Sequence, residues 1–139
     1  MRWLCWAMGV ACVLIGLEHL IIGPQAVPDT GDLTATDDSQ NRFFSAIFAG
    51  YGLAWVWAAR QSPIPRNAVR LLAAVFLAGG LARLLSVAVH GWPHWFVIAL
   101  TVVEFALPPV FFWLTQEADN HAQALSEGGS TAPARSTNS

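Results

Sequence analysis

The sequence predicts an all-α integral membrane protein, built as an antiparallel bundle of four transmembrane helices. Of its 139 residues, 55% are hydrophobic and 12% are charged, whereas roughly 25% of the residues of a soluble domain are charged. The hydrophobic residues also gather in four runs, each long enough to cross about 30 Å of hydrocarbon. These runs cover residues 3–23, 43–59, 71–90 and 95–115, and proline or glycine punctuates the chain between them.

The first run, 3–23, begins directly after Arg2. Because it contains Glu18 and His19 and lacks a small-x-small cleavage site before Pro24, we expect a retained span and not a cleaved signal peptide. Small residues recur along it in steps of three and four, which predicts close packing against a second helix. These residues are Cys5, Gly9, Cys12, Gly16, His19 and Gly23.

The second run, 43–59, is the shortest, and the preceding Asp37-Asp38-Ser39 are residue types typical of a helix N-terminus. The third run, 71–90, follows an arginine-bearing loop. Both runs carry small residues at helical spacing, so each is expected to pack closely against a neighbouring helix. The second run offers Ser45, Ala49 and Gly52, and the third offers Gly79, Ala82 and Ser86.

The fourth run, 95–115, follows a tight corner of glycine, tryptophan and proline and contains Pro108-Pro109. Proline within a helix removes a backbone donor, so we expect a kink or a freed carbonyl at this point. Residues 116–139 are polar and small, a composition that predicts a disordered tail on the cytoplasmic side. The predicted domains are therefore a transmembrane domain over 1–115 and this tail.

The distribution of charge predicts the orientation, because short arginine-rich loops stay on the cytoplasmic side of a membrane. Arg60, Arg66 and Arg70 crowd the loop between the second and third runs, while segment 24–42 carries four aspartates. With four crossings of the plasma membrane, both termini are expected in the cytoplasm. Tryptophans are expected near the interfaces, with Trp3, Trp6, Trp55, Trp57 and Trp113 at inner ends and Trp92 and Trp95 at the outer one.

Three charged residues, Glu18, Arg83 and Glu104, fall inside the apolar runs. Each costs roughly 2.5 to 3.5 kcal/mol there on insertion scales, so each needs a partner. Counted from the outer helix ends at ~1.5 Å per residue, they lie about 7, 10 and 14 Å deep. We therefore expect one cluster of ligand-binding or ion-pairing residues in the outer half of the bundle, made of Glu18, His19, Arg42, Arg83 and Glu104.

Arg83 and Glu104 are expected to pair, because the third and fourth runs are joined by a tight corner. The cluster has two interpretations. One is an ion-pair network that only fixes the register of the helices. The other is a small outward-facing cavity for a ligand, a headgroup or a proton.

Other chemistry finds little support in the sequence. A net charge of -2 with seven basic residues argues against binding to nucleic acid. No metal and no cofactor is expected, because the turn between His90 and His94 does not hold both on one helical face. No serine or cysteine is visibly paired with a base, so no catalytic residue is assigned.

A family resemblance rests on spaced motifs: Gly16 and His19, Ser39-Gln-Asn-Arg42-Phe43, Gly50-Tyr-Gly52, Gly79-Gly-Leu-Ala-Arg83-Leu-Leu-Ser86, His90-Gly91-Trp-Pro93, and Glu104 with Pro108. From Gly16 to about Trp113 the chain resembles the bacterial membrane family catalogued as domain of unknown function 4345. The resemblance implies a compact four-helix membrane protein and no particular activity. It singles out Arg42, Arg83 and Glu104, and Glu18 fits the family pattern less closely.

The first functional interpretation is a non-enzymatic protein that binds membrane lipid or a small apolar ligand, or that supports a partner membrane protein. The second is a membrane enzyme acting on a lipid-soluble substrate, with Glu104 or Glu18 as the acid or base. The third is a component of a proton-coupled transporter. This interpretation is less favoured, because the chain has only four predicted helices and no evident inverted repeat. The sequence does not determine the ligand or the oligomeric state.

Overall fold

The structure is a computed structural model that describes residues 1–26 and 34–130. Within these residues the chain is helical throughout its regular parts, with no strand, so the all-α prediction is confirmed. The elements are α1 (Arg2–Ile22), the 3-10 helix η1 (Gly23–Ala26), α2 (Ala35–Arg60), α3 (Arg66–His90) and α4 (Trp95–Ser130).

Three of these helical segments are long and apolar enough to cross a membrane: Arg2–Ala26, Arg66–His90 and Trp95–Leu125. Helix α2 is not among them. Its first turns are polar, and its apolar remainder includes glycine, tyrosine and tryptophan, which hydropathy scales rank well below leucine or valine. The crossing of the membrane by α2 therefore stays a prediction.

Helix α2 begins well before its apolar run, at the acidic segment that the sequence marked as a helix start. Thr34 is the N-cap residue: its side chain accepts a hydrogen bond from the backbone N–H of Asp37, and the Asp37 carboxylate accepts one from the backbone N–H of Thr34. This reciprocal arrangement is a capping box. The hydrogen bonds from Thr34 hold the pKa of Asp37 below its usual value.

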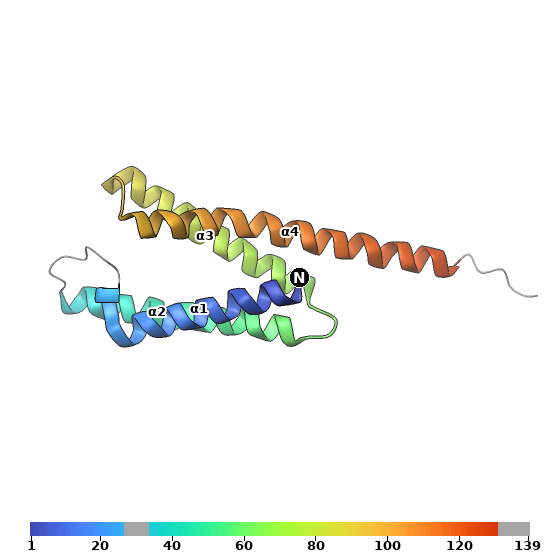
Figure 1. The fold of residues 1–139 in the computed structure, drawn as a ribbon, viewed down its shortest axis with the longest axis horizontal. Helices are drawn as coiled ribbons and strands as arrows, with labels where there is room; N and C mark the ends of the chain where they lie inside the picture. The colour runs from blue at the N-terminus through green and yellow to red at the C-terminus, as the bar shows by residue number, and fades with distance from the viewer. Residues whose placement is uncertain (27–33, 131–139) are drawn as a thin grey trace, which may run out of the picture.

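The helices form two pairs (Figure 1), with α1 packed along α2 and α3 packed along α4. Contact between the pairs is made mainly by α2 and α3. In Figure 1 the pairs converge near the start of α1 and diverge toward the α1–α2 and α3–α4 connections. We call the convergent end the inner end and the divergent end the outer end.

Glycines bring α1 and α2 into backbone contact. A Cβ atom on Gly52 would lie 2.7 Å from the backbone nitrogen of Val13 and 2.8 Å from the carbonyl oxygen of Gly9. A Cβ atom on Gly16 would lie 2.7 Å from the backbone nitrogen of Ala49. These distances are too short for any side chain, so the predicted packing through small residues of α1 and α2 is confirmed.

The corresponding prediction for α3 is wrong. Among the described residues nothing lies within 4 Å of a Cβ atom on Gly79, and Ala82 and Ser86 are exposed. The helix instead packs through Gly80, where a Cβ atom would lie 3.1 Å from the ring of Phe105. A shift of one residue turns the contact face by about 100°, and spacing alone could not distinguish the two registers.

The core lies at the inner end, where all four helices meet. Its buried residues are Cys5, Met8, Cys12, Trp55, Ala58, Ala59, Val69, Ala73 and Phe111. The rings of Trp55 and Phe111 have centroids 4.4 Å apart, and the hydroxyl of Tyr51 donates to the carbonyl oxygen of Leu72 at 2.6 Å. Trp55 is 0% exposed, so at this end it packs in the core and does not face the surface.

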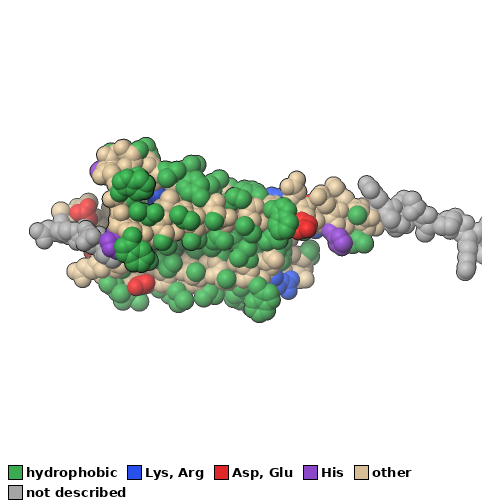
Figure 2. Space-filling view, turned by 45° about the horizontal axis from the view of Figure 1, so that its top comes forward, with side chains coloured by type: hydrophobic (Ala, Val, Ile, Leu, Met, Phe, Trp, Pro, Cys, Tyr) green, Lys and Arg blue, Asp and Glu red, His purple; other side chains and the backbone are tan. Residues whose placement is uncertain are grey.

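Large hydrophobic side chains cover the outside of all four helices, among them Leu14, Ile47, Leu85 and Val102. Figure 2 shows them over the middle of one face, with charged side chains toward its two ends. Soluble monomers rarely expose apolar patches of this extent. The surface is the kind that acyl chains cover.

Helix α4 continues to Ser130 and extends beyond the other helices (Figure 1). The helix thus includes residues 116–130, the first part of the tail for which disorder was predicted, and residues 131–139 lie outside the described part of the chain. Glutamine, glutamate, alanine and leucine in this extension are good helix formers. The helix also runs without a break through Pro108 and Pro109.

Candidate functional site

Arg83 of α3 and Glu104 of α4 form the predicted ion pair. The Nε of Arg83 donates to both carboxylate oxygens of Glu104, at 2.9 Å each. The pair depends on the glycine one turn before Arg83, because a Cβ atom on Gly80 would lie 3.2 Å from the Cβ of Glu104. The absence of a side chain at Gly80 lets α4 come close enough for this contact.

Glu104 is the buried member of the pair, with 7% of its surface exposed. A carboxylate in such surroundings needs its counter-ion, since loss of one partner of a buried pair costs about 3 to 5 kcal/mol. Arg83 therefore stabilises the packing of α4 on α3.

Arg83 is the open member, with 38% of its side chain exposed. A guanidinium group has five N–H donors, and Glu104 receives only the one on Nε. Neither Nη1 nor Nη2 donates a hydrogen bond to any residue within 1–26 or 34–130. The terminal edge of this guanidinium is thus available to an acceptor from outside the chain.

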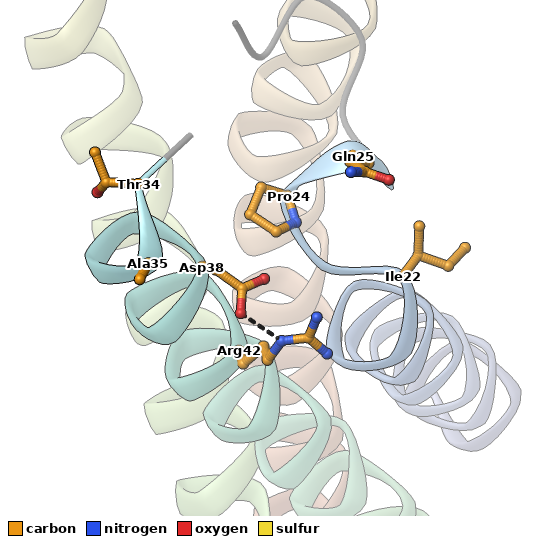
Figure 3. Close-up of a pocket in the computed structure, with 7 residues that line it drawn as sticks. All are labelled: Ile22, Pro24, Gln25, Thr34, Ala35, Asp38 and Arg42. Carbon is orange, nitrogen blue, oxygen red and sulfur yellow. Dashed lines mark hydrogen bonds and ion pairs between the residues drawn. The ribbon is translucent and has the colours of Figure 1, made fainter. Parts of the chain in front are cut away.

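Arg42 of α2 occupies a different place (Figure 3). Its Nε donates to Asp38 at 2.9 Å, and its Nη1 donates to the carbonyl oxygen of Leu20 at 2.6 Å. A cation at this position binds the last carbonyl oxygens of α1 and interacts favourably with the negative end of its helix dipole. Gly23 (φ +80°) makes the turn, and a Cβ atom there would lie 2.9 Å from Asp38 Oδ1. Arg42 therefore ties the outer end of α1 to α2.

A cavity of about 370 Å³ lies beside Arg42, between η1 and the start of α2 (Figure 3). It is lined by Ile22, Pro24, Gln25, Thr34, Ala35, Asp38 and Arg42. Neither Arg83 nor Glu104 lines it. The two charged groups on its wall neutralise one another, so they offer little net charge to a ligand.

The remaining members of the predicted cluster stand apart from the Arg83–Glu104 pair. His19 binds its own helix, with Nδ1 2.9 Å from the carbonyl oxygen of Ile15. Glu18 is exposed and makes no hydrogen bond or ion pair with the residues that the structure describes. One cluster of all five residues is not formed, because α1–α2 and α3–α4 diverge at the end where these residues lie.

The sequence reasoning missed a second charged group, at the inner end. Asp119 in the extension of α4 accepts hydrogen bonds from Arg66 and Arg70 at the start of α3, and Arg70 also donates to Thr115 at 3.1 Å. The two arginines hold the pKa of Asp119 below its usual value. The signal available in the sequence was a shared spacing of four residues, between Arg66 and Arg70 on one helix and between Thr115 and Asp119 on the other.

A metal site is not evident in the described ranges, where no group of three or more histidine, cysteine, aspartate and glutamate side chains comes together. His90 is exposed at the end of α3. The ring of His94 lies against that of Trp95, with centroids 5.6 Å apart.

Comparison with known proteins identifies a family and nothing finer. Neither the curated proteins nor the solved structures give a match. Residues 1–115 match the family model described as "Domain of unknown function (DUF4345)". The match covers all of the helices except the extension of α4, and the chain therefore belongs to this family of unknown function.

Proposed function

We propose that this chain is a four-span protein of the plasma membrane that binds a lipid-soluble ligand at Arg83 and does not transform it. In this proposal α2 is the fourth span. It packs along α1 over the glycine contacts described above, and its opposite side exposes Phe43, Phe44, Ile47 and Leu53. With the arginine-rich inner end in the cytoplasm, both termini are cytoplasmic.

One observation carries the proposal: the terminal edge of the Arg83 guanidinium lies in an apolar surface and has no partner among the described residues. Seven residues separate Arg83 from the end of α3, which places it about 10 Å below that end. Side chains on a helix lean toward its N-terminus, so Arg83 leans toward the membrane centre, away from the outer headgroups. A lipid-soluble molecule with an acceptor atom would satisfy these donors.

The geometry favours binding over acid catalysis. Both oxygens of Glu104 accept from the Nε of Arg83, and only 7% of Glu104 is exposed, so a substrate has little access to the carboxylate. Glu18 has neither burial nor a positioning partner among the described residues. The role that remains for Glu104 is to hold Arg83 in place through Nε, which leaves the terminal nitrogens for a ligand.

The test is retention of a small molecule by the purified protein. Wild type, Arg83→Lys and Arg42→Lys would be transferred into nanodiscs with their native lipids and examined by native mass spectrometry. Lysine at position 83 keeps the positive charge opposite Glu104 and lacks the two terminal nitrogens, Nη1 and Nη2, of the guanidinium group. We expect a molecule held by wild type and by Arg42→Lys and reduced at least tenfold in Arg83→Lys. Equal retention by all three proteins, or by none, would contradict the proposal.

A further inference from the structure

The two sides of the Arg83 side chain differ in what lies beside them. Gly80 and Gly79 precede Arg83 by three and four residues, so they lie one turn below it on the same side of α3. The Gly80 side is filled by Phe105 and Glu104 of α4. The Gly79 side has nothing within 4 Å among the described residues. An open surface beside Gly79 thus lies within one helical turn of Arg83, on the side that α4 does not cover.

The charge at this place is already balanced. Arg83 contributes one positive charge and Glu104 one negative charge, and they are bonded to each other. An anionic ligand would leave a net charge in an apolar region, which is unfavourable. A neutral acceptor binds the same N–H groups without this cost.

We propose that the ligand is a neutral lipid-soluble molecule with a carbonyl oxygen, of the ester, ketone or quinone class. Its oxygen accepts hydrogen bonds from Nη1 or Nη2 of Arg83, and its apolar body lies over Gly79. This inference rests on the proposed function and adds the chemical class and the position of the ligand.

The test uses three probes that share a ten-carbon chain with a terminal diazirine. The first carries a methyl ester, the second a sulfate, and the third no polar group. Each is added to the full-length protein in nanodiscs at equal mole fraction, and photolabelling is mapped by peptide mass spectrometry. We expect the ester to label residues 75–86 at least tenfold more than either other probe.

Two variants make the result specific. Gly79→Leu fills the open side of α3, and Gly50→Leu is its matched control, because nothing described lies within 4 Å of a Cβ atom on Gly50 either. Labelling by the ester should fall at least tenfold in Gly79→Leu and in Arg83→Lys and stay unchanged in Gly50→Leu. Equal thermal unfolding of the two leucine variants would show that the fold is kept.

The contrary outcomes separate the two proposals. Stronger labelling by the sulfate, lost in Arg83→Lys, would overturn the neutral class and leave ligand binding at Arg83 standing. Labelling by the ester that depends on Arg83 and not on Gly79→Leu would overturn the position. Equal labelling by all three probes, unaffected by either substitution, would overturn the proposed function as well.

Discussion

The inner and outer ends of this molecule keep their charged residues in opposite surroundings. At the inner end Arg66, Arg70 and Asp119 lie on the rim of a dense core built around Trp55 and Phe111. At the outer end the helix pairs diverge (Figure 1), and the Arg83–Glu104 ion pair joins α3 to α4 within one of them. Where all four helices pack together, charges are peripheral. Where the two pairs diverge, the ion pair is part of the contact between α3 and α4, with the carboxylate buried.

Removing one partner of the outer pair should have the largest effect. Arg83→Leu leaves the buried carboxylate of Glu104 unpaired and is expected to destabilise the protein by about 3 to 5 kcal/mol. Arg83→Leu combined with Glu104→Leu should recover most of this loss, because no uncompensated charge remains. Unfolding in mixed micelles with increasing denaturant measures both. A double variant as unstable as Arg83→Leu would show that the pair is needed for more than its charge balance.

The glycine contact of α1 with α2 should be next in size. A methyl group at Gly52 meets the backbone of Val13 and Gly9, and overpacking of this kind costs about 1 to 3 kcal/mol. Gly50→Ala is the matched control on the same helix and should change stability by less than about 0.5 kcal/mol, as surface substitutions do. The same unfolding measurement applies. Equal effects of Gly52→Ala and Gly50→Ala would contradict the close contact.

Asp119 should show the smallest effect, and it should depend on pH. Asp119 lies beyond the apolar run that ends at residue 115, and its pKa is lowered by Arg66 and Arg70. Because the folded pKa lies below the unfolded one, the stabilisation is complete above the usual aspartate pKa of about 3.9. It is lost as the pH falls through the lowered value.

The measurement is amide hydrogen exchange over residues 116–125. At neutral pH, Asp119→Asn should speed exchange there and leave the core around Trp55 unchanged. As the pH falls below the usual aspartate value, the difference between wild type and this variant should shrink, after correction for the intrinsic exchange rate. If the difference in exchange between wild type and the variant persisted at low pH, the protection would be assigned to the hydrogen bond between Arg70 and Thr115 and not to the charge of Asp119.

Sequence patterns predicted the helices well, because proline and glycine punctuate each connection and the apolar runs between them are long. The Arg83–Glu104 pair was also predictable, since a tight corner brings two opposite charges of similar depth together. The prediction at Gly79 failed because Gly79 and Gly80 are equivalent in the sequence, and only packing decides which of them faces α4.

The predicted cluster depends on lateral distances that the sequence does not give. Counting depth places Glu18, Arg83 and Glu104 in the outer half of the spans and says nothing of the lateral distance between helix pairs. The spacing of Arg66 and Arg70 and that of Asp119 and Thr115 offered a signal, but the two sets lie about fifty residues apart in the chain, so the fold is needed to bring them together.

The tie between Arg42 and the end of α1 has a mechanical consequence. It makes α1 and α2 one stiff arm over their whole length, while α3 and α4 form a second arm fastened to it chiefly at the core. A small rotation about the contact between Trp55 and Phe111 would therefore become a larger displacement at the outer ends of the two pairs.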